Sequence, residues 1–305
     1  MSGVRERLAL LEARSREERS TWRMPAFAGI DPGLPFVPEP FTQLYHLPVY
    51  ETLSPHQRLR YNQLFGLRTN EMFMVFEKGV TAQLIGHLKS ALGDGDRVLA
   101  DCLEGMLVEE ARHHRMFLQF NRRFLPEGYN RGGRCFSRDS VLERGLLPLL
   151  GRYSGFWPLL LWAVLVLEEF STAFSRWLLK CPGLEPAYLG LHRQHLKDEM
   201  RHVQLDEILL NRLMDATGSL ARIRDGRLFQ VFFRRVLSPR HSGPNVVRYL
   251  AREDPSLESR CPEMLRQLRR LPRDPGLTRL LEDPEAMPVT HAMLGRYPGF
   301  RWFES

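Results

Sequence analysis

Two segments of the sequence repeat the pattern Glu-x-x-His, at Glu110–His113 and at Glu199–His202. If each segment is helical, positions i and i+3 lie on one face, so the carboxylate and the imidazole of each motif converge. One such motif is commonly a solvated helix face, whereas two motifs on different helices are a known way to hold a pair of metal ions. The two motifs therefore predict a dinuclear metal site.

The segment around the first motif predicts that both of its donor side chains are buried. Steps of three and four residues through this segment meet only apolar positions apart from the two donors, namely Leu99, Leu103, Met106, Phe117 and Phe120. Burial of a carboxylate without a partner is costly. A metal ion is the simplest partner for Glu110 and His113.

The segment around the second motif carries a polar stripe that cannot pack as an ordinary core. The same steps meet Tyr188, His192, His195, Glu199, His202, Asp206, Leu209 and Leu213. His195, Glu199 and His202 are spaced i, i+4 and i+7, so they share one helix face. A solvent-exposed polar face is the alternative, but the remaining apolar face of this helix is discontinuous. We therefore expect His195 to be a third imidazole donor.

Two further helices are expected to supply one glutamate each. Glu77 is a candidate because its helix-face neighbours include Phe73, Val80 and Leu84. Glu71 lies on another face of the same helix, and we expect it at the protein surface.

The other single glutamate is Glu168 or Glu169. The helix face of Glu169 runs on to Arg176 and Lys180, so it is expected to turn outward sooner. Glu168 is therefore favoured as the ligand, with Glu169 as the alternative.

The predicted ligands offer only carboxylate oxygen and imidazole nitrogen, and they are Glu77, Glu110, His113, Glu168, His195, Glu199 and His202. Such a set suits iron or manganese better than a metal that prefers thiolates. We expect two iron ions, with manganese as the alternative. Asp198 and Asp206 are expected to orient ligand histidines from a second layer, and Glu109 either does the same or faces water.

Four long helical segments are expected to position these donors. They span 55–92, 96–124, 155–180 and 184–216, and Gly or Pro residues follow the first three. A short helix is predicted at 138–150.

The flanking segments have a different character. Residues 24–55 are rich in proline and predict an extended arm after an N-terminal helix, while short helices are predicted at 226–236, 243–252 and 262–270. The expected organisation is a helix and arm at 1–54, a four-helix bundle at 55–216 and a helical extension at 217–305, packed as a single all-α domain.

Composition excludes several classes of protein. The net charge is +7, but the arginines are spread along the chain without a nucleic-acid-binding motif. The most apolar run, Phe156–Leu167, is shorter than the roughly 20 residues of a membrane span. The four cysteines form no CxxC pair, and the N-terminus has no apolar signal core. These features predict a cytoplasmic protein that neither binds nucleic acid nor spans a membrane.

The pattern Glu77…Glu110-x-x-His113 with Glu168…Asp198-Glu199-x-x-His202 resembles the di-iron carboxylate superfamily. His195, four residues before Glu199, is the mark of a narrower resemblance to the p-aminobenzoate N-oxygenase family. The resemblance covers about residues 55–216. It implies a ferritin-like bundle, O2 activation through a peroxo-di-iron species and stepwise oxidation of an arylamine. One departure is Glu109, which stands where the second motif has Asp198.

The resemblance also implies partners. The substrate would be a small-molecule amine or a carrier-bound one, as in natural-product biosynthesis, and its pocket candidates are Phe73, Phe117, Leu165, Thr172 and Tyr188. No Gly-x-Gly-x-x-Gly fingerprint follows a strand, so the electrons are expected from an external ferredoxin or reductase. Assembly as a homodimer is left open.

Two other functions remain open at this point. The first is a di-iron C–H hydroxylase, desaturase or oxidative-cleavage enzyme, because fold and metal do not fix the reaction. The second is an iron-storage or radical-generating protein. A radical-generating subunit would favour a tyrosine four residues after the first motif histidine, and that position is Phe117.

Overall fold

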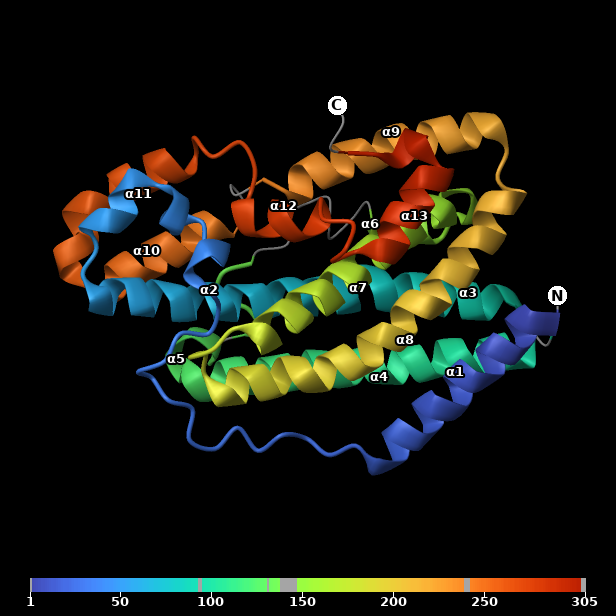
Figure 1. Ribbon diagram of the computed structural model, residues 1–305, viewed down its shortest axis with the longest axis horizontal. Helices are drawn as coiled ribbons and strands as arrows, with labels where there is room; N and C mark the ends of the chain where they lie inside the picture. The colour runs from blue at the N-terminus through green and yellow to red at the C-terminus, as the bar shows by residue number, and fades with distance from the viewer. Residues whose placement is uncertain (1, 93–94, 131, 138–146, 239–241, 303–305) are drawn as a thin grey trace.

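The protein is described by a computed structural model that covers residues 2–92, 95–130, 132–137, 147–238 and 242–302. The described residues form helices and no strand, so the predicted all-α fold is confirmed (Figure 1). Its centre is a bundle of four long helical rods, which carries all the predicted donors.

The first rod begins at a strong helix start. Ser54 and Gln57 form a reciprocal capping box, and α2 runs over Pro55–Phe76. A single helix was predicted from 55 to 92, but the structure differs. A π-helical turn, η4, spans Glu77–Thr81 before α3 resumes at Ala82–Leu92. Such turns widen a helix locally and are frequent at functional sites.

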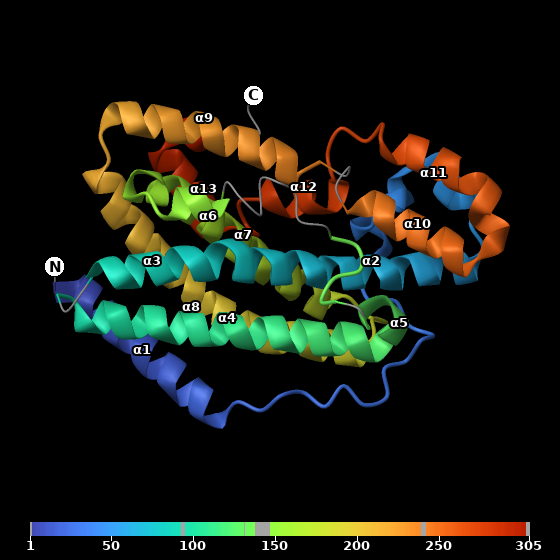
Figure 2. The same ribbon diagram turned by 180° about the vertical axis from the view of Figure 1, so that it is seen from behind.

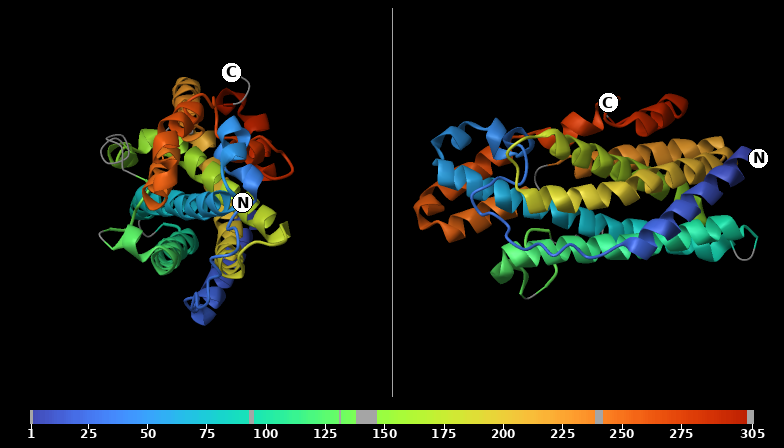
Figure 3. Two further views of the ribbon diagram at one scale, coloured as in Figure 1. Left: turned by 90° about the vertical axis from the view of Figure 1, so that its left-hand side faces the viewer. Right: turned by 60° about the horizontal axis from the view of Figure 1, so that its bottom comes forward.

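The other three rods are uninterrupted. They are α4 at Arg97–Phe124, α7 at Trp157–Lys180 and α8 at Pro186–Ala216. The rod of α2 and α3 lies beside α4, and an end-on view shows the rods packed around a common core (Figures 2 and 3). Short elements connect them: α5 at Pro126–Tyr129, α6 at Leu147–Gly151 and η6 at Ser154–Phe156. Of the helix predicted at 138–150, residues 138–146 lie outside the described residues.

An N-terminal segment lies along the bundle. Helix α1 spans Ser2–Thr21, and an extended stretch then leads to three 3-10 turns, η1 at Glu39–Phe41, η2 at Leu44–His46 and η3 at Pro48–Thr52. Figure 3 shows this arm running from α1 along the rods to the far end of the bundle. Phe36 and Phe41 of the arm are buried, so the arm adds apolar contacts to the core.

The C-terminal segment contains more helices than the sequence predicted. Helices α10 at Gly243–Glu253 and α11 at Cys261–Leu268 match two of the predicted segments, and α9 at Ser219–Val236 begins seven residues before the third. Two further helices, α12 at Pro275–Leu281 and α13 at Pro288–Arg296, were not predicted. The turns η7 at Pro255–Arg260 and η8 at Pro298–Phe300 complete the segment.

Helix α7 is the most apolar rod and lies in the core. The stretch Ser154–Lys180 is long and apolar enough to cross a membrane by composition, yet 94 % of its most apolar window is buried inside the protein. Trp162 of α7 stacks on Phe300, with 4.7 Å between the ring centroids. This burial identifies α7 as a core helix of the bundle.

The prediction that Glu71 lies at the surface was wrong. Its carboxylate is fully buried and accepts hydrogen bonds from the Tyr129 hydroxyl at 2.6 Å and from the backbone N–H groups of Cys135, Phe136 and Ser137 at 2.5 to 3.1 Å. Burial raises the pKa of Glu71, and these donors oppose that rise. The carboxylate therefore fixes the segment after α5 against α2.

Candidate metal centre

The structure brings all seven predicted donors together in the bundle core. Their potential ligand atoms form two groups: the His195 group, which is Glu77, His113, His195 and Glu199, and the Glu168 group, which is Glu110, Glu168, Glu199 and His202. Within each group these atoms lie within 4.8 Å of one another, and every donor is buried. Glu199 belongs to both groups, so the two potential metal positions are adjacent.

Each rod contributes to the groups. The π-turn η4 starts at Glu77, α4 carries the first motif, α7 carries Glu168 and α8 carries the other three donors. The i, i+3 spacing on α4 and the i, i+4, i+7 spacing on α8 turn the donors to one side of each helix.

Hydrogen bonds outside the groups set the ring orientation of His113 and His202. His113 Nε2 lies 2.8 Å from Asp198 Oδ2, and His202 Nε2 lies 2.9 Å from Glu109 Oε2. Because an ionised carboxylate only accepts, each Nε2 carries the proton and donates it. In the neutral ring that a metal requires, the lone pair of each Nδ1 then faces the donor groups, where His113 Nδ1 is 3.2 Å from Glu199 Oε1.

His195 turns its other ring nitrogen toward the donors. Its Nε2 lies 3.0 Å from Glu77 Oε1 and 3.1 Å from Glu199 Oε1. Its Nδ1 is buried without a hydrogen-bond partner among the described residues. The third imidazole therefore offers Nε2 to the His195 group, with its ring edge-on to that of His113 at a centroid distance of 4.5 Å.

Asp206 does not act as predicted. It was expected to orient a ligand histidine, but it is fully buried and neither carboxylate oxygen has a hydrogen-bond partner among the described residues. The Nε2–H of His202 donates to Glu109 instead, and Asp206 lies one turn further along α8. Burial raises the pKa of Asp206 well above its usual range.

The unpaired polar atoms of the donor set fit a pair of cations. Buried oxygens of Glu77, Glu110 and Glu168 have no hydrogen-bond partner among the described residues. Four carboxylates and three imidazoles make up the set. Imidazoles are neutral when they bind a metal, so two divalent ions would balance the charge of the set. Oxygen and nitrogen donors of this kind suit iron or manganese.

Without cations, protons must take their place. Burial raises the pKa of Glu110 to about 7 and that of Glu168 well above its usual range. Burial alone would lower the pKa of His202, but Glu199 and the hydrogen bonds of Glu109 and Glu110 raise it well above its usual range. Metal binding therefore has to displace protons from the set.

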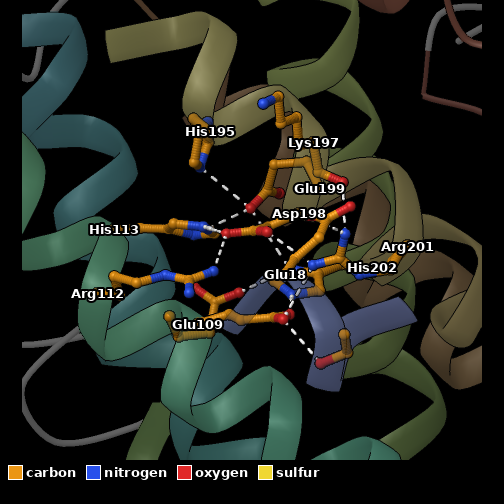
Figure 4. A network of polar contacts seen from close by, with 12 residues as sticks. Glu18, Glu109, Arg112, His113, His195, Lys197, Asp198, Glu199, Arg201 and His202 are labelled. Carbon is orange, nitrogen blue, oxygen red and sulfur yellow. Dashed lines mark hydrogen bonds and ion pairs between the residues drawn. The ribbon is translucent and has the colours of Figure 1, made fainter. Parts of the chain in front are cut away.

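A network of charged residues surrounds His113 and His202 (Figure 4). Arg201 donates to Glu109 Oε1 at 2.9 Å, to Asp198 Oδ1 at 2.6 Å and to Glu18 Oε2 at 2.6 Å. Arg112 also pairs with Asp198. Burial opposes ionisation of Asp198, but its histidine and arginine partners hold its pKa well below the usual range. Both outer carboxylates thus stay ionised and keep their histidines oriented.

Sequence reasoning missed the part that α1 has in this network. Ser15 donates to Glu109 Oε1 at 2.8 Å, and Glu18 accepts from Arg201. A cavity of about 20 Å³ lies beneath α1 next to His202, which is room for about one water molecule. No motif in the sequence links α1 to the donors, because helical spacing carries no information about a different helix.

Glu168 and Glu169 have different partners. Glu168 belongs to a donor group and accepts a hydrogen bond from Thr81 Oγ1 at 3.2 Å. Glu169 is also buried, and it accepts from the backbone N–H groups of Val289 at 2.9 Å and Thr290 at 2.6 Å. It thereby caps the N-terminus of α13 rather than facing solvent.

Replacement of these two neighbours by alanine should separate metal binding from stability. Glu168→Ala should remove about half of the bound iron or more, because its donor group loses a ligand. Glu169→Ala should keep the iron and lose about 1–2 kcal/mol of stability, because α13 loses its cap. Mass spectrometry of metal content and thermal melting measure the two effects. Iron loss in Glu169→Ala alone would reverse the assignment.

The predicted pocket residues lie at different places. Phe73 and Phe117 pack beside His195, with ring centroids 5.6 and 4.9 Å from its ring. The Tyr188 hydroxyl donates to the backbone oxygen of Gly66, and its ring stacks on that of Phe36.

The other two pocket candidates lie on α7. The Thr172 hydroxyl donates to the backbone oxygen of Glu169 at 2.8 Å, so that hydroxyl already has a partner. Leu165 is fully buried in the core. Of the five pocket candidates, Phe73 and Phe117 are therefore the ones whose rings contact a donor, His195.

Comparison with known proteins identifies a family and structural neighbours. A model of the family described as p-aminobenzoate N-oxygenase AurF matches residues 6–241. No curated protein matches the chain. Among solved structures, a mutant of an R2-like ligand-binding oxidase with an anaerobically reconstituted Mn/Fe cofactor matches at 16 % identity and a TM-score of 0.42. That match covers 95 % of this chain and 91 % of the other chain.

Proposed function

The chain belongs to the p-aminobenzoate N-oxygenase family, and on this basis we propose that it N-oxygenates an aryl or related amine with O2 at a pair of iron ions. Family membership makes it an O2-dependent di-metal oxidoreductase. The observation that carries the proposal is the pair of adjacent buried donor groups that share Glu199. The seven donors are proposed as the ligands, with manganese as the alternative metal.

The residues around the donors have clear tasks in this proposal. The metal pair, when bound, supplies the redox chemistry that lets O2 react. Asp198 and Glu109 hold the rings of His113 and His202 in position through the Nε2 protons. The rings of Phe73 and Phe117 form an apolar wall beside His195 that excludes water.

The reaction also defines what must come from outside. When one oxygen atom enters the amine and the other leaves as water, two electrons and two protons are consumed. A ferredoxin or a reductase is the proposed electron donor. A natural-product pathway as the source of the amine, a cytoplasmic location and a homodimer remain predictions, and so does the division into arm, bundle and extension.

Rapid mixing of reduced, iron-loaded protein with O2 tests the proposal. The experiment is run with and without a panel of arylamines and followed by absorbance and by product mass. We expect a visible absorbance feature that decays faster with an arylamine and yields products heavier by oxygen. The metal-free protein is the control. A feature that decays at the same rate with every amine, with no change in amine mass, would contradict N-oxygenation and favour a C–H substrate.

A further inference from the structure

His192 lies in an aromatic cage one turn before the donor His195 on α8. The cage consists of four rings whose centroids lie 4.6 to 6.0 Å from that of His192, and they belong to Tyr188, Phe174, Phe117 and Phe73. The imidazole is fully buried. It is in neither donor group, so the proposed metal site makes no use of it.

Neither ring nitrogen of His192 has a hydrogen-bond partner among the described residues. Burial holds the pKa of His192 well below its usual range, and the charge of His195 acts in the same direction. The ring is therefore neutral and offers one N–H donor and one acceptor nitrogen. Buried polar groups are nearly always paired, so two unpaired nitrogens indicate a missing partner.

Packing alone does not explain an imidazole at this position. A cage of aromatic rings would be filled at lower cost by leucine or phenylalanine, which have no polar atoms to bury. The Ser175 hydroxyl on α7 is also buried without a partner among the described residues. Ser175 is seven residues after Glu168, so it lies on the α7 face that carries this donor.

The cage adjoins the His195 group. The rings of Phe73 and Phe117 each contact both His192 and His195. Phe73 lies in the last turn of α2, just before the π-turn. It is the least buried of the four cage residues, at 6 % exposure. Binding of an aryl ring beside His192 therefore requires a shift of the Phe73 side chain, of the kind that ligands commonly induce.

We propose that His192 is a specificity-determining residue that hydrogen-bonds a neutral polar group at the end of the aryl substrate remote from its amine. This inference rests on the proposed function. The four side chains that form the cage carry no positive charge. A carboxylate placed there would be buried with no cationic side chain of the cage to pair with, which disfavours it. The cage therefore selects an amide, hydroxyl or similar neutral group over a carboxylate.

A matched set of ligands tests this selection. 4-Aminobenzamide, 4-aminobenzoate and aniline share the ring and the amine, and they differ in a neutral, an anionic or no remote group. Binding to the reduced, iron-loaded protein is measured by calorimetry without O2. We expect the wild type to bind the amide at least about tenfold more tightly than either other ligand, as one buried hydrogen bond allows.

Two variants locate the effect at His192. His192→Leu should lose the tenfold preference for the amide while binding of aniline changes little. His192→Gln keeps a donor and an acceptor and should restore part of the preference. Iron content and melting temperature establish that each variant is folded.

Several results would overturn the inference. These are a wild type that binds 4-aminobenzoate as tightly as the amide, a wild type that binds none of the three ligands, and a His192→Leu variant that weakens aniline as much as the amide. Addition of O2 then separates the two proposals. The expected binding pattern without oxygenated product would refute the proposed function and leave recognition by His192 standing.

Discussion

Replacement of Glu199 by alanine should abolish binding of both metal ions, whereas His195→Ala should cost only one. Glu199 is the donor that the two groups share, and His195 belongs to one group. Without Glu199, each group keeps three donors and the set has one negative charge fewer against two divalent ions. Activity should fall by more than the roughly 10–100-fold that follows loss of an outer hydrogen-bond partner.

Metal content per folded chain measures this difference directly. We expect close to two irons in the wild type, about one in His195→Ala and close to none in Glu199→Ala. Glu104→Gln, an exposed change on α4, is the control and should keep the wild-type content. Equal iron in the two donor variants would show that Glu199 does not bridge the groups.

Replacement of Glu71 by alanine should destabilise the protein by about 3–5 kcal/mol, because it strands several buried donors at once. The Tyr129 hydroxyl and three backbone N–H groups all depend on this carboxylate. Water reaching the opened segment would satisfy some of them, which is why the expected loss is smaller than a sum over four hydrogen bonds.

Denaturant unfolding measures this loss of stability, provided that the dependence of the unfolding free energy on denaturant concentration is the same in the variant and the wild type. Glu127→Ala, an exposed change on α5 two residues before Tyr129, is the control and should stay within about 0.5 kcal/mol of the wild type. Glu71→Gln keeps one acceptor oxygen, so its free energy of unfolding should lie between those of Glu71→Ala and Glu127→Ala. A loss below about 1 kcal/mol for Glu71→Ala would mean that solvent replaces the carboxylate freely.

The sequence alone was sufficient for features that depend on one helix at a time. The stripes through Glu110 and through Glu199 predicted buried donors, because residues three and four apart share a face in any α-helix. The same reasoning favoured Glu168 over Glu169, but its ground was wrong, because Glu169 is buried rather than turned outward. The structure places all seven predicted donors in two adjacent groups. The π-turn at Glu77 was not predictable, because it does not alter the local residue pattern by which helices are recognised.

Only the tertiary structure decided which polar groups meet across elements. Glu71 binds a segment more than 60 residues away, Glu169 caps a helix 120 residues away, and Ser15 reaches Glu109 from α1. Asp206 and His192 are buried yet lack such partners among the described residues. Helical periodicity determines the face on which a side chain lies, but the partner on that face depends on how separate helices pack.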